Sequence, residues 1–489
     1  MTSTEAQFHR DAATSAADLE QRSRIRTGMR SYSAARAARV AAFQDWQAAR
    51  NAAAEIKTGA IDRLHELLAQ FTDQFEARGG RVFFAADAAE ARQYVLDLIG
   101  RHRAQRVVKS KTMTSEEIHL NEALAEAGCD VIESDLGEYI VQLLRQPPFH
   151  FVFPAMHLGR GQIAELFRRE LGIHCGDDPT ELTGVARKVL RQVYAQADLG
   201  ISGANFLIAE TGMISITENE GNARLTTALP RVHVALVGIE KVLPTMADLA
   251  LFLPLLATSG AGQALTCYNS LIGGPRQPGE PDGPKEFHVV LLDNGRTALL
   301  ADGEQRDALH CIRCGACLNV CPVFNTVGGH SYGTTYQGPI GSVITPHLRG
   351  LQSWKHLSHA SSLCGACTEV CPVKIDLHHH LIHNRRNAAG GAPSRSHPAR
   401  PVAGDAPRRA MERGLYRLFA AVMNRPWLYR LVGAVARHTS PIRNRLEDTF
   451  ADPLRAWSRT RRLPSPARTS FRDLWRQRQA HGAHGKAHG

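Results

Sequence analysis

The sequence lacks the features that mark several large classes of protein. Its longest apolar run, residues 249–257, is nine residues long and contains Pro254, whereas a membrane-spanning helix needs about 20 apolar residues. The N-terminal region has no apolar segment and carries acidic residues such as Glu5, Asp11 and Glu20, so a secretory signal is not expected. Gly200-Ile-Ser-Gly203 does not match G-x-G-x-x-G, and no G-x-x-x-x-G-K-[ST] occurs. We therefore expect a cytoplasmic protein without a Rossmann-type flavin or nicotinamide site.

Most of the chain has no excess of positive charge. The 489 residues carry a net charge of +11. Residues 388–489 hold 20 Lys and Arg against 6 Asp and Glu, so they contribute +14 and the remainder about −3. A nucleic-acid-binding protein would need basic residues on a folded face with aromatic platforms. No such module is recognisable, and no nucleic-acid partner is predicted.

Cysteine is concentrated in two clusters, which contain seven of the ten cysteines. The first cluster is Cys311-Ile-Arg-Cys314-Gly-Ala-Cys317-Leu-Asn-Val-Cys321-Pro322, and the second is Cys364-Gly-Ala-Cys367-Thr-Glu-Val-Cys371-Pro372. The first matches C-x2-C-x2-C-x3-C-P, in which three thiolates bind one iron–sulfur cube and the fourth binds a neighbouring cube. The second lacks the first cysteine of this pattern, and Ser361 stands in its place.

Crossed ligation predicts two cofactor sites. Cys311, Cys314, Cys317 and Cys371 would hold one 4Fe-4S cluster, and Cys321, Cys364 and Cys367 would hold a second. The fourth ligand of the second cluster is Ser361, water or a substrate or partner group, or the cluster has only three irons and is 3Fe-4S. The sequence does not choose among these.

Other uses of the cysteines are less consistent with the pattern. A zinc ion takes four ligands and does not require C-x2-C-x2-C-x3-C-P, and disulfides are not expected in a large chain without an export signal. Cys129, Cys175 and Cys267 are isolated, which is typical of small apolar residues rather than ligands. His378-His-His380 suggests a metal site, but a solvated helix start explains it as well.

Strands and helices alternate from about residue 81 to residue 245. Short apolar strands are predicted at 81–85, 107–110, 130–133, 199–205, 209–216 and 233–238, followed by one at 287–292 with a hairpin turn at Asn294-Gly295. Such alternation favours an α/β fold with a largely parallel sheet. Apolar positions between 338 and 354 predict a short helical hairpin between the cysteine clusters.

Several motifs resemble known families. The segment between the cysteine clusters resembles the helical ferredoxin domain of the iron–sulfur subunits of succinate dehydrogenase and fumarate reductase. K-S-K-T-M-T-S-E-E from Lys109, G-A-N-F-L-I-A-E-T-G-M-I from Gly203, E-N-E-G-N-A-R-L-T from Glu218, Gly273-Gly-Pro-Arg-Gln277 and Ser470-Phe-Arg-Asp-Leu-Trp-Arg resemble the lactate-utilisation protein B family over nearly the whole chain.

This resemblance implies a role in the oxidation of L-lactate to pyruvate with two companion proteins, this member carrying electrons. It also implies that the N-terminal domain is related to the sugar-isomerase and CoA-transferase α/β fold. The expected fold is thus an α/β domain followed by an α-helical ferredoxin-like two-cluster domain and a helical basic tail.

Four regions are expected along the chain. They are an N-terminal helical segment (1–60), the α/β lactate-utilisation domain (61–300), the ferredoxin-type domain (301–387), and a linker with a basic amphipathic C-terminal region (388–489). Two amphipathic helices are predicted within 415–437. They would lie on anionic lipid at the inner face of the membrane, on an acidic partner subunit, or on the body of the protein.

Three functions are compatible with these patterns. In the first, the chain relays electrons from a partner dehydrogenase subunit through two clusters to an acceptor, which would lie at the membrane. In the second, the α/β domain is catalytic and binds a small carboxylic acid or thioester near Glu210, which resembles the acidic nucleophile of CoA-transferases beside the polar loop 218–222. The alternative interpretation is that Glu210 caps a turn. In the third, the three-cysteine cluster binds substrate through its iron, as in a dehydratase.

Overall fold

The computed structural model describes residues 4–389, 406–446 and 469–484, with the single positions 449, 452, 455 and 467. The chain divides into two compact units, Met1–Val402 and Ala403–Gly489. The larger unit contains two sheets and the helices around them, together with the cysteine clusters. Most of the predicted linker lies in 390–405, outside the described residues.

A six-stranded parallel sheet forms the centre of the α/β domain, in the order β1-β10-β7-β4-β2-β3. The strands are β1 (Arg81–Ala85), β2 (Arg106–Lys109), β3 (Asp130–Glu133), β4 (Leu199–Ser202), β7 (Val232–Gly238) and β10 (Glu286–Leu292). β7 is buried along its whole length, because helices and a second sheet cover both faces of the main sheet, as is usual for a parallel sheet.

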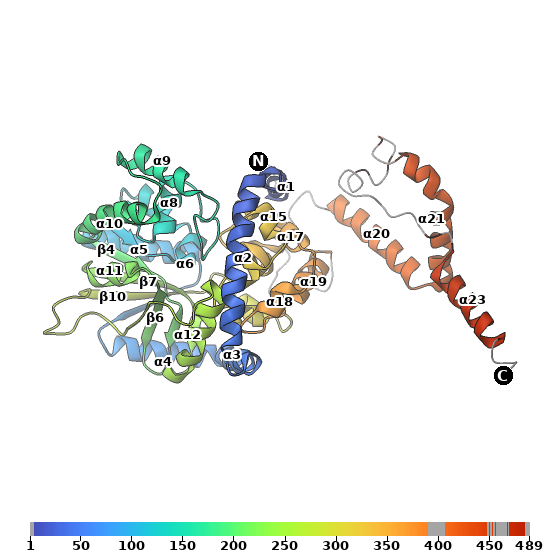
Figure 1. Ribbon diagram of the computed structural model, residues 1–489. Helices are drawn as coiled ribbons and strands as arrows, with labels where there is room; N and C mark the ends of the chain where they lie inside the picture. Colours follow the sequence, from blue (N-terminus) through green and yellow to red (C-terminus); the bar gives the residue numbers. More distant parts are fainter. Residues whose placement is uncertain are drawn as a thin grey trace. The chain divides into compact units, whose positions relative to one another are not determined.

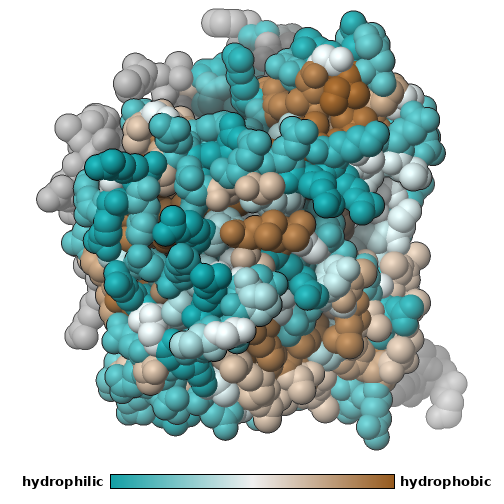
Figure 2. Space-filling model, turned by 90° about the vertical axis from the view of Figure 1, so that its left-hand side faces the viewer, coloured by the Kyte–Doolittle hydropathy of each residue, from teal (hydrophilic) through white to brown (hydrophobic). Residues whose placement is uncertain are grey.

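The two faces of the main sheet pack against different elements. Val234 and Leu236 of β7 pack with α5 (Ala88–His102) and α7 (Leu120–Glu126), whereas Ala235 and Val237 pack with α4 (Leu64–Glu76) and the second sheet. This alternation follows from the two-residue period of a strand. Further helices of this domain are α6 (Met113–Glu117), α8 (Leu136–Leu143), α9 (Arg160–Leu171), α10 (Pro179–Gln196) and α11 (Asn222–Ala228). The side of the unit seen in Figure 2 is mostly hydrophilic, and its apolar side chains form separate patches.

The second sheet has four strands in the order β8-β5-β6-β9. They are β5 (Phe206–Ile208), β6 (Met213–Glu218), β8 (Val242–Leu243) and β9 (Tyr268–Ile272). β6 runs antiparallel to β5 and β9. The predicted strand 209–216 is therefore wrong in its extent, because residues 209–212 turn the chain between β5 and β6.

The hairpin predicted at Asn294-Gly295 is also wrong. Both residues have positive φ, 45° and 93°, as a hairpin turn with two left-handed residues would require. However, β10 is paired in parallel with β1 and β7, and the turn leads into α13 (Arg296–Leu300). The two positive φ values therefore belong to the turn that starts α13 and not to a hairpin.

Three N-terminal helices hold the α/β domain and the cysteine-rich domain together. They are α1 (Thr4–Ala17), α2 (Leu19–Ala41) and α3 (Trp46–Asp62), and α2 crosses the larger unit as one long helix (Figure 1). Phe8, Ile25 and Met29 share a core with Phe252 of α12 (Met246–Ala261) and with Phe324 of the cysteine-rich domain. Arg50 donates a hydrogen bond from Nε to the carbonyl of Cys371 at 2.9 Å. Sequence reasoning gave this segment no role.

Short helices make up the cysteine-rich domain. They are η2 (Arg306–His310), α14 (Ala316–Asn319), α15 (Phe324–Val327), η3 (His330–Tyr332), α16 (Gly338–Arg349), α17 (Leu351–His359), α18 (Ala366–Val370) and α19 (Leu377–Ala388). α16 and α17 form the predicted helical hairpin, joined at Gly350. The fold class expected from the sequence is confirmed.

The smaller unit consists of α20 (Ala406–Met423), α21 (Pro426–Leu446) and α23 (Phe471–His484) in its described parts. The first two contain the predicted amphipathic segment 415–437. Large apolar side chains on them are exposed, among them Leu415, Phe419, Trp427 and Val435. None of the described helices is both long enough and apolar enough to span a membrane.

Candidate functional site

The two cysteine loops repeat one backbone conformation. Arg313 and Gly315 in the first loop have φ values of 58° and 82°, and Leu363 and Gly365 in the second have 54° and 81°. The Arg313 N–H donates to Cys311 Sγ at 3.4 Å, and the Leu363 N–H donates to the hydroxyl of Ser361 at 3.1 Å. The Ser361 oxygen therefore has the same backbone partner in the second loop that the Cys311 sulfur has in the first.

One group of thiols forms where the first loop meets the end of the second. A cavity is lined by Cys311, Cys314, Cys317 and Cys371, together with apolar side chains such as Ile340 and Val373. Burial and, to a smaller extent, the nearby thiol of Cys311 outweigh the backbone N–H donors and raise the pKa of Cys371 to about 12. The structure thus brings together the four cysteines that crossed ligation assigns to one site.

The other three cysteines form a second, more exposed group. Burial raises the pKa of Cys367 to about 11, and the neighbouring thiols of Cys321 and Cys364 act in the same direction. Cys364 is exposed, and the backbone N–H of Ala366 lowers the pKa of its thiol. The two groups therefore differ in their access to solvent, which is one of the properties that set the potential of an iron–sulfur cluster.

These surroundings fit an iron–sulfur group. Backbone N–H groups point at the sulfurs, as in the 3.4 Å contact from Ile375 N to Cys371 Sγ, and such hydrogen bonds stabilise the charge that cluster sulfurs carry. Because burial raises the pKa of most of these thiols, they need a bound cation to be present as thiolates. Seven sulfur donors in two groups match the ligand demand of two clusters better than that of zinc.

A larger cavity of about 400 Å³ lies beside the first group of thiols. Its wall includes residues that follow three neighbouring parallel strands: 110–114 after β2, 203–205 after β4, and Glu240 and Lys241 of η1 (Ile239–Lys241) after β7. Arg313, Cys314 and Tyr336 of the cysteine-rich domain complete the wall. The cavity therefore spans the contact between the carboxyl edge of the sheet and the first cysteine loop.

Buried charges link this edge of the sheet to the cysteine loop. Arg296 donates from Nη1 and Nη2 to Glu117 at 2.9 and 2.7 Å and from Nε to Glu240 at 2.6 Å. The other oxygen of Glu240 accepts from Arg313 at 3.2 Å. Burial raises the pKa of Glu240, but Arg296, Arg313 and Lys241 outweigh it and lower that pKa to about 2. Glu240 is thus a carboxylate held between the two domains.

Glu210 lies elsewhere. Its side chain is exposed, and its carboxylate accepts the N–H of Met246, the first residue of α12, at 2.8 Å. It is not among the residues that line the large cavity, whereas Glu218, Asn219, Glu220 and Asn222 of the predicted polar loop are. The geometry therefore agrees with the interpretation of Glu210 as a capping residue.

Two cationic wall residues, Lys241 and Arg313, were not predicted as site residues. Arg313 lies inside the first cysteine motif, and Lys241 follows the end of a buried strand. The position of Lys241 after a strand was the signal that could have identified it, because ligands of open α/β sheets bind at the carboxyl ends of strands. Which strand ends would meet the cysteine loop could not be read from the sequence.

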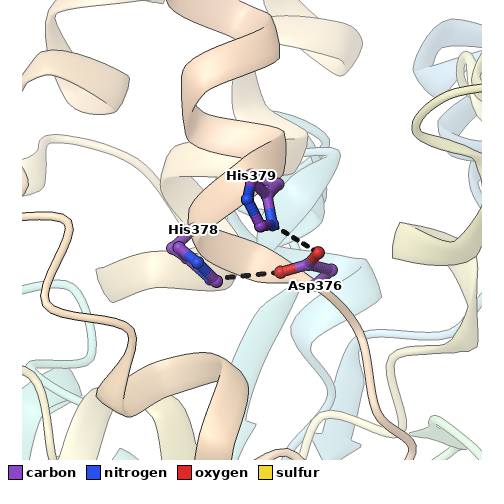
Figure 3. Close-up of side chains that lie close together, drawn as sticks. All are labelled: Asp376, His378 and His379. Atoms are coloured by element: carbon purple, nitrogen blue, oxygen red, sulfur yellow. Dashed lines mark hydrogen bonds and ion pairs between the residues drawn. The ribbon is translucent and has the colours of Figure 1, made fainter.

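The histidine run does not act as one group. His378 and His379 approach the carboxylate of Asp376 (Figure 3), with Nδ1 to oxygen distances of 3.1 and 2.5 Å. His380 is buried and pairs instead with Asp307 at 2.8 Å. Contacts with carboxylates thus account for all three side chains. Of the three isolated cysteines, Cys129 is buried as expected, whereas Cys175 is half-buried and Cys267 is exposed.

Comparison with known proteins identifies the domains. Residues 68–292 match the LUD domain, residues 307–375 match the 4Fe-4S dicluster domain, and residues 383–480 match the C-terminal domain of lactate utilisation protein B. A solved structure of a DUF162 family protein from Deinococcus radiodurans covers 47% of this chain and 98% of its own, with a TM-score of 0.26 and 16% identity.

Curated relatives match over almost their whole length. Lactate utilization protein B of Shouchella clausii is 44% identical over 90% of this chain and 90% of its own, and that of Geobacillus sp. is 42% identical over the same shares. The protein of the same name from Oceanobacillus iheyensis is 43% identical over 89% of this chain and 88% of its own. The chain thus belongs to the lactate utilization protein B family and is an iron–sulfur protein of lactate utilisation.

Proposed function

We propose that this chain carries electrons in the oxidation of L-lactate to pyruvate, taking them from a partner dehydrogenase subunit and passing them through two clusters to an acceptor. The observation that carries the proposal is the grouping of the seven thiols. Cys371, more than 50 residues after Cys317, lines the cavity of the first loop, and Cys321 lies near Cys364 and Cys367. Crossed grouping of this kind is what two adjacent clusters require.

In this proposal Cys311, Cys314, Cys317 and Cys371 hold one 4Fe-4S cluster, and Cys321, Cys364 and Cys367 hold the other. The hydrogen bond from Leu363 to Ser361 supports Ser361 as the fourth ligand of a second 4Fe-4S cluster. The alternative is a 3Fe-4S cluster on three cysteines. When bound, each cluster takes up and releases one electron, so two clusters match the two electrons that lactate oxidation releases.

The burial of the two groups supports one site for electron exchange with other proteins. Cys314, Cys317 and Cys371 are buried, whereas Cys364 is exposed. The apolar wall around the first group excludes water, and the exposed loop of the second offers an approach for another protein. We place the exchange with a companion protein or acceptor at this second site.

The partners in this proposal are two companion lactate-utilisation proteins and an electron acceptor at the inner face of the membrane. The chain itself would act in the cytoplasm. Exposed apolar side chains on α20 and α21 support a docking role for the smaller unit. The second candidate, a catalytic α/β domain acting on a small acid through Glu210, has less support, because Glu210 caps α12 and does not line the cavity.

The test is anaerobic analysis of iron and acid-labile sulfide with electron paramagnetic resonance. Wild type, Cys311→Ser and Cys364→Ser are compared, with Cys129→Ser as the matched control because Cys129 is remote from both loops in sequence. Two full cubes give about eight irons and a 3Fe-4S site gives about seven. Each of the two ligand variants should alter the paramagnetic signal of one cluster, and the control variant should alter neither signal. Colourless protein that contains zinc and no labile sulfide would refute the proposal.

A further inference from the structure

The large cavity lies at the point where the order of the main sheet reverses. From β2 the chain passes to β3 on one side, and from β4 it passes to β7 on the other, while β2 and β4 are neighbours. The loops after β2 and β4, residues 110–114 and 203–205, both line the cavity. The carboxyl ends of strands at such a switch point form a crevice in which open α/β sheets bind ligands.

Two cationic groups in the cavity wall have unused hydrogen-bonding capacity. Lys241 is 8% exposed, and its ammonium group has no hydrogen bond or ion pair among the described residues. Arg313 uses Nη2 for Glu240, but its Nη1 is buried without a partner. Burying charged donors without acceptors is costly, so these two groups call for an anion.

The acidic residues of the same cavity are already engaged. Asp135 accepts the N–H groups of Gly137 and Glu138 at the start of α8. Glu218 accepts those of Ala223 and Arg224, and Glu220 accepts that of Leu136. These carboxylates cap helix starts, and burial raises the pKa of Glu218 and Glu220 against the backbone N–H groups that lower it. Their presence in the wall makes the cavity unfavourable for an extended polyanion.

We propose that this cavity binds a small organic acid, whose carboxylate lies between Lys241 and Arg313. A volume of about 400 Å³ lies within the usual range for small-molecule sites and exceeds what a three-carbon acid needs. Polar side chains such as Asn205, Thr217 and Gln263 also line it and offer partners for a hydroxyl or keto oxygen. The site adds ligand binding to the proposed electron relay.

The ligand would lie against the first cluster loop. Cys314, a proposed cluster ligand, is part of the cavity wall, and Arg313 precedes it in the chain. A carboxylate on Arg313 changes the charge next to that cluster, and the potential of a cluster depends on nearby charge and hydrogen bonds. Binding should therefore be visible in the signal of the first cluster as well as in a calorimeter.

The experiment titrates the anaerobic, cluster-loaded full chain with sodium L-lactate and sodium pyruvate by isothermal calorimetry. Methyl lactate tests the need for the charge, and inorganic phosphate tests the preference for a carboxylate. Lys241→Gln removes one charged partner, with Lys188→Gln as the control, since Lys188 is an exposed lysine on α10 outside the cavity. Ala261→Leu adds volume at the wall without touching a charge.

We expect saturable binding of at least one of the two acids and none of the ester. Lys241→Gln should weaken binding at least about tenfold, Ala261→Leu should abolish it, and Lys188→Gln should not change it. The paramagnetic signal of the first cluster should shift on binding in wild type and not in Ala261→Leu.

Lys241 also lies near Cys311, so its charge could serve only the cluster. In that case Lys241→Gln would alter the cluster signal and leave acid binding unchanged, which overturns the proposal. Tighter binding of phosphate than of either acid, or no binding of the acids at millimolar concentration by protein with both clusters, also overturns it. If protein with both clusters fails to bind the acids, the electron relay remains intact. If the protein binds an acid but contains no clusters, only the relay is refuted.

Discussion

Replacing Glu240 by Gln should destabilise the larger unit more than any other single isosteric change at a carboxylate of the cavity wall. Glu240 is buried and accepts hydrogen bonds from Arg296 at 2.6 Å and from Arg313 at 3.2 Å. Gln keeps the size of the side chain and removes the charge. Arg296 retains Glu117, but Arg313 has no other ion pair among the described residues.

The magnitude follows from the pKa of the carboxyl group. Arg296, Arg313 and Lys241 overcome the effect of burial and lower the pKa of Glu240 from 4.5 to about 2. Since one pKa unit corresponds to 1.36 kcal/mol, these cations stabilise the folded state by about 3 kcal/mol when Glu240 is charged. Removing one partner of a buried ion pair typically costs about 3–5 kcal/mol, which agrees with the value from the pKa. The expected loss is a large fraction of a typical free energy of unfolding of about 5–15 kcal/mol.

The sign of the pH dependence also follows. A carboxyl group whose pKa is lower in the folded state stabilises that state fully above pH 4.5, and the contribution is lost as pH falls towards 2. Glu240→Gln should therefore be less stable than wild type at pH 7, with a difference that shrinks below pH 4.5.

The assay is anaerobic urea unfolding at pH 7, followed by circular dichroism, on wild type, Glu240→Gln and Glu126→Gln. Glu126 is an exposed glutamate on α7 without a hydrogen bond or ion pair among the described residues, so its replacement should have little effect. A loss below about 1 kcal/mol for Glu240→Gln would show that the charge network does not hold the sheet to the cysteine loop.

Four further outcomes are expected. Ser361→Ala should reduce iron from about eight to about seven per chain and Ser361→Cys should keep eight; equal iron in Ser361→Ala and wild type would rule out the serine ligand. Arg50→Met should speed the loss of the first cluster in air, because Arg50 holds the carbonyl of Cys371, and absorbance decay measures the rate. Lys57→Met, which removes a 2.6 Å hydrogen bond to the carbonyl of Glu240, should lower the unfolding midpoint; an unchanged midpoint would contradict that role. A chain ending at 389 should keep both clusters but no longer float with anionic vesicles, and retained flotation would exclude α20 and α21 as the lipid contact.

Part of the fold was open to prediction because it depends on local patterns. Apolar runs of four to seven residues predicted all six strands of the main sheet. Five of these strands lie before residue 245, and the sixth was predicted at 287–292. The Asn294-Gly295 turn shows the limit of such patterns. Its two positive φ values follow from residue type, but parallel pairing of β10 with β1 and β7 is a tertiary property that excludes a hairpin.

The candidate site divides in the same way. Glu210 follows a strand, as a catalytic carboxylate often does, yet the start of α12 lies where it can accept the N–H of Met246. Lys241 follows another strand and lines the cavity with Arg313. Nothing in either local sequence distinguishes these two positions, because the difference depends on which strand end faces the cysteine loop.

The sequence by itself determined the spacing of the cysteines and the loop conformation around them, since two residues between thiols and a glycine after the second one constrain the backbone over a few bonds. Only the tertiary structure decided that the helices of residues 4–62 brace the cysteine loops and that cations 72 positions apart share one cavity. Those contacts join segments far apart in the chain, and packing of the whole core selects them.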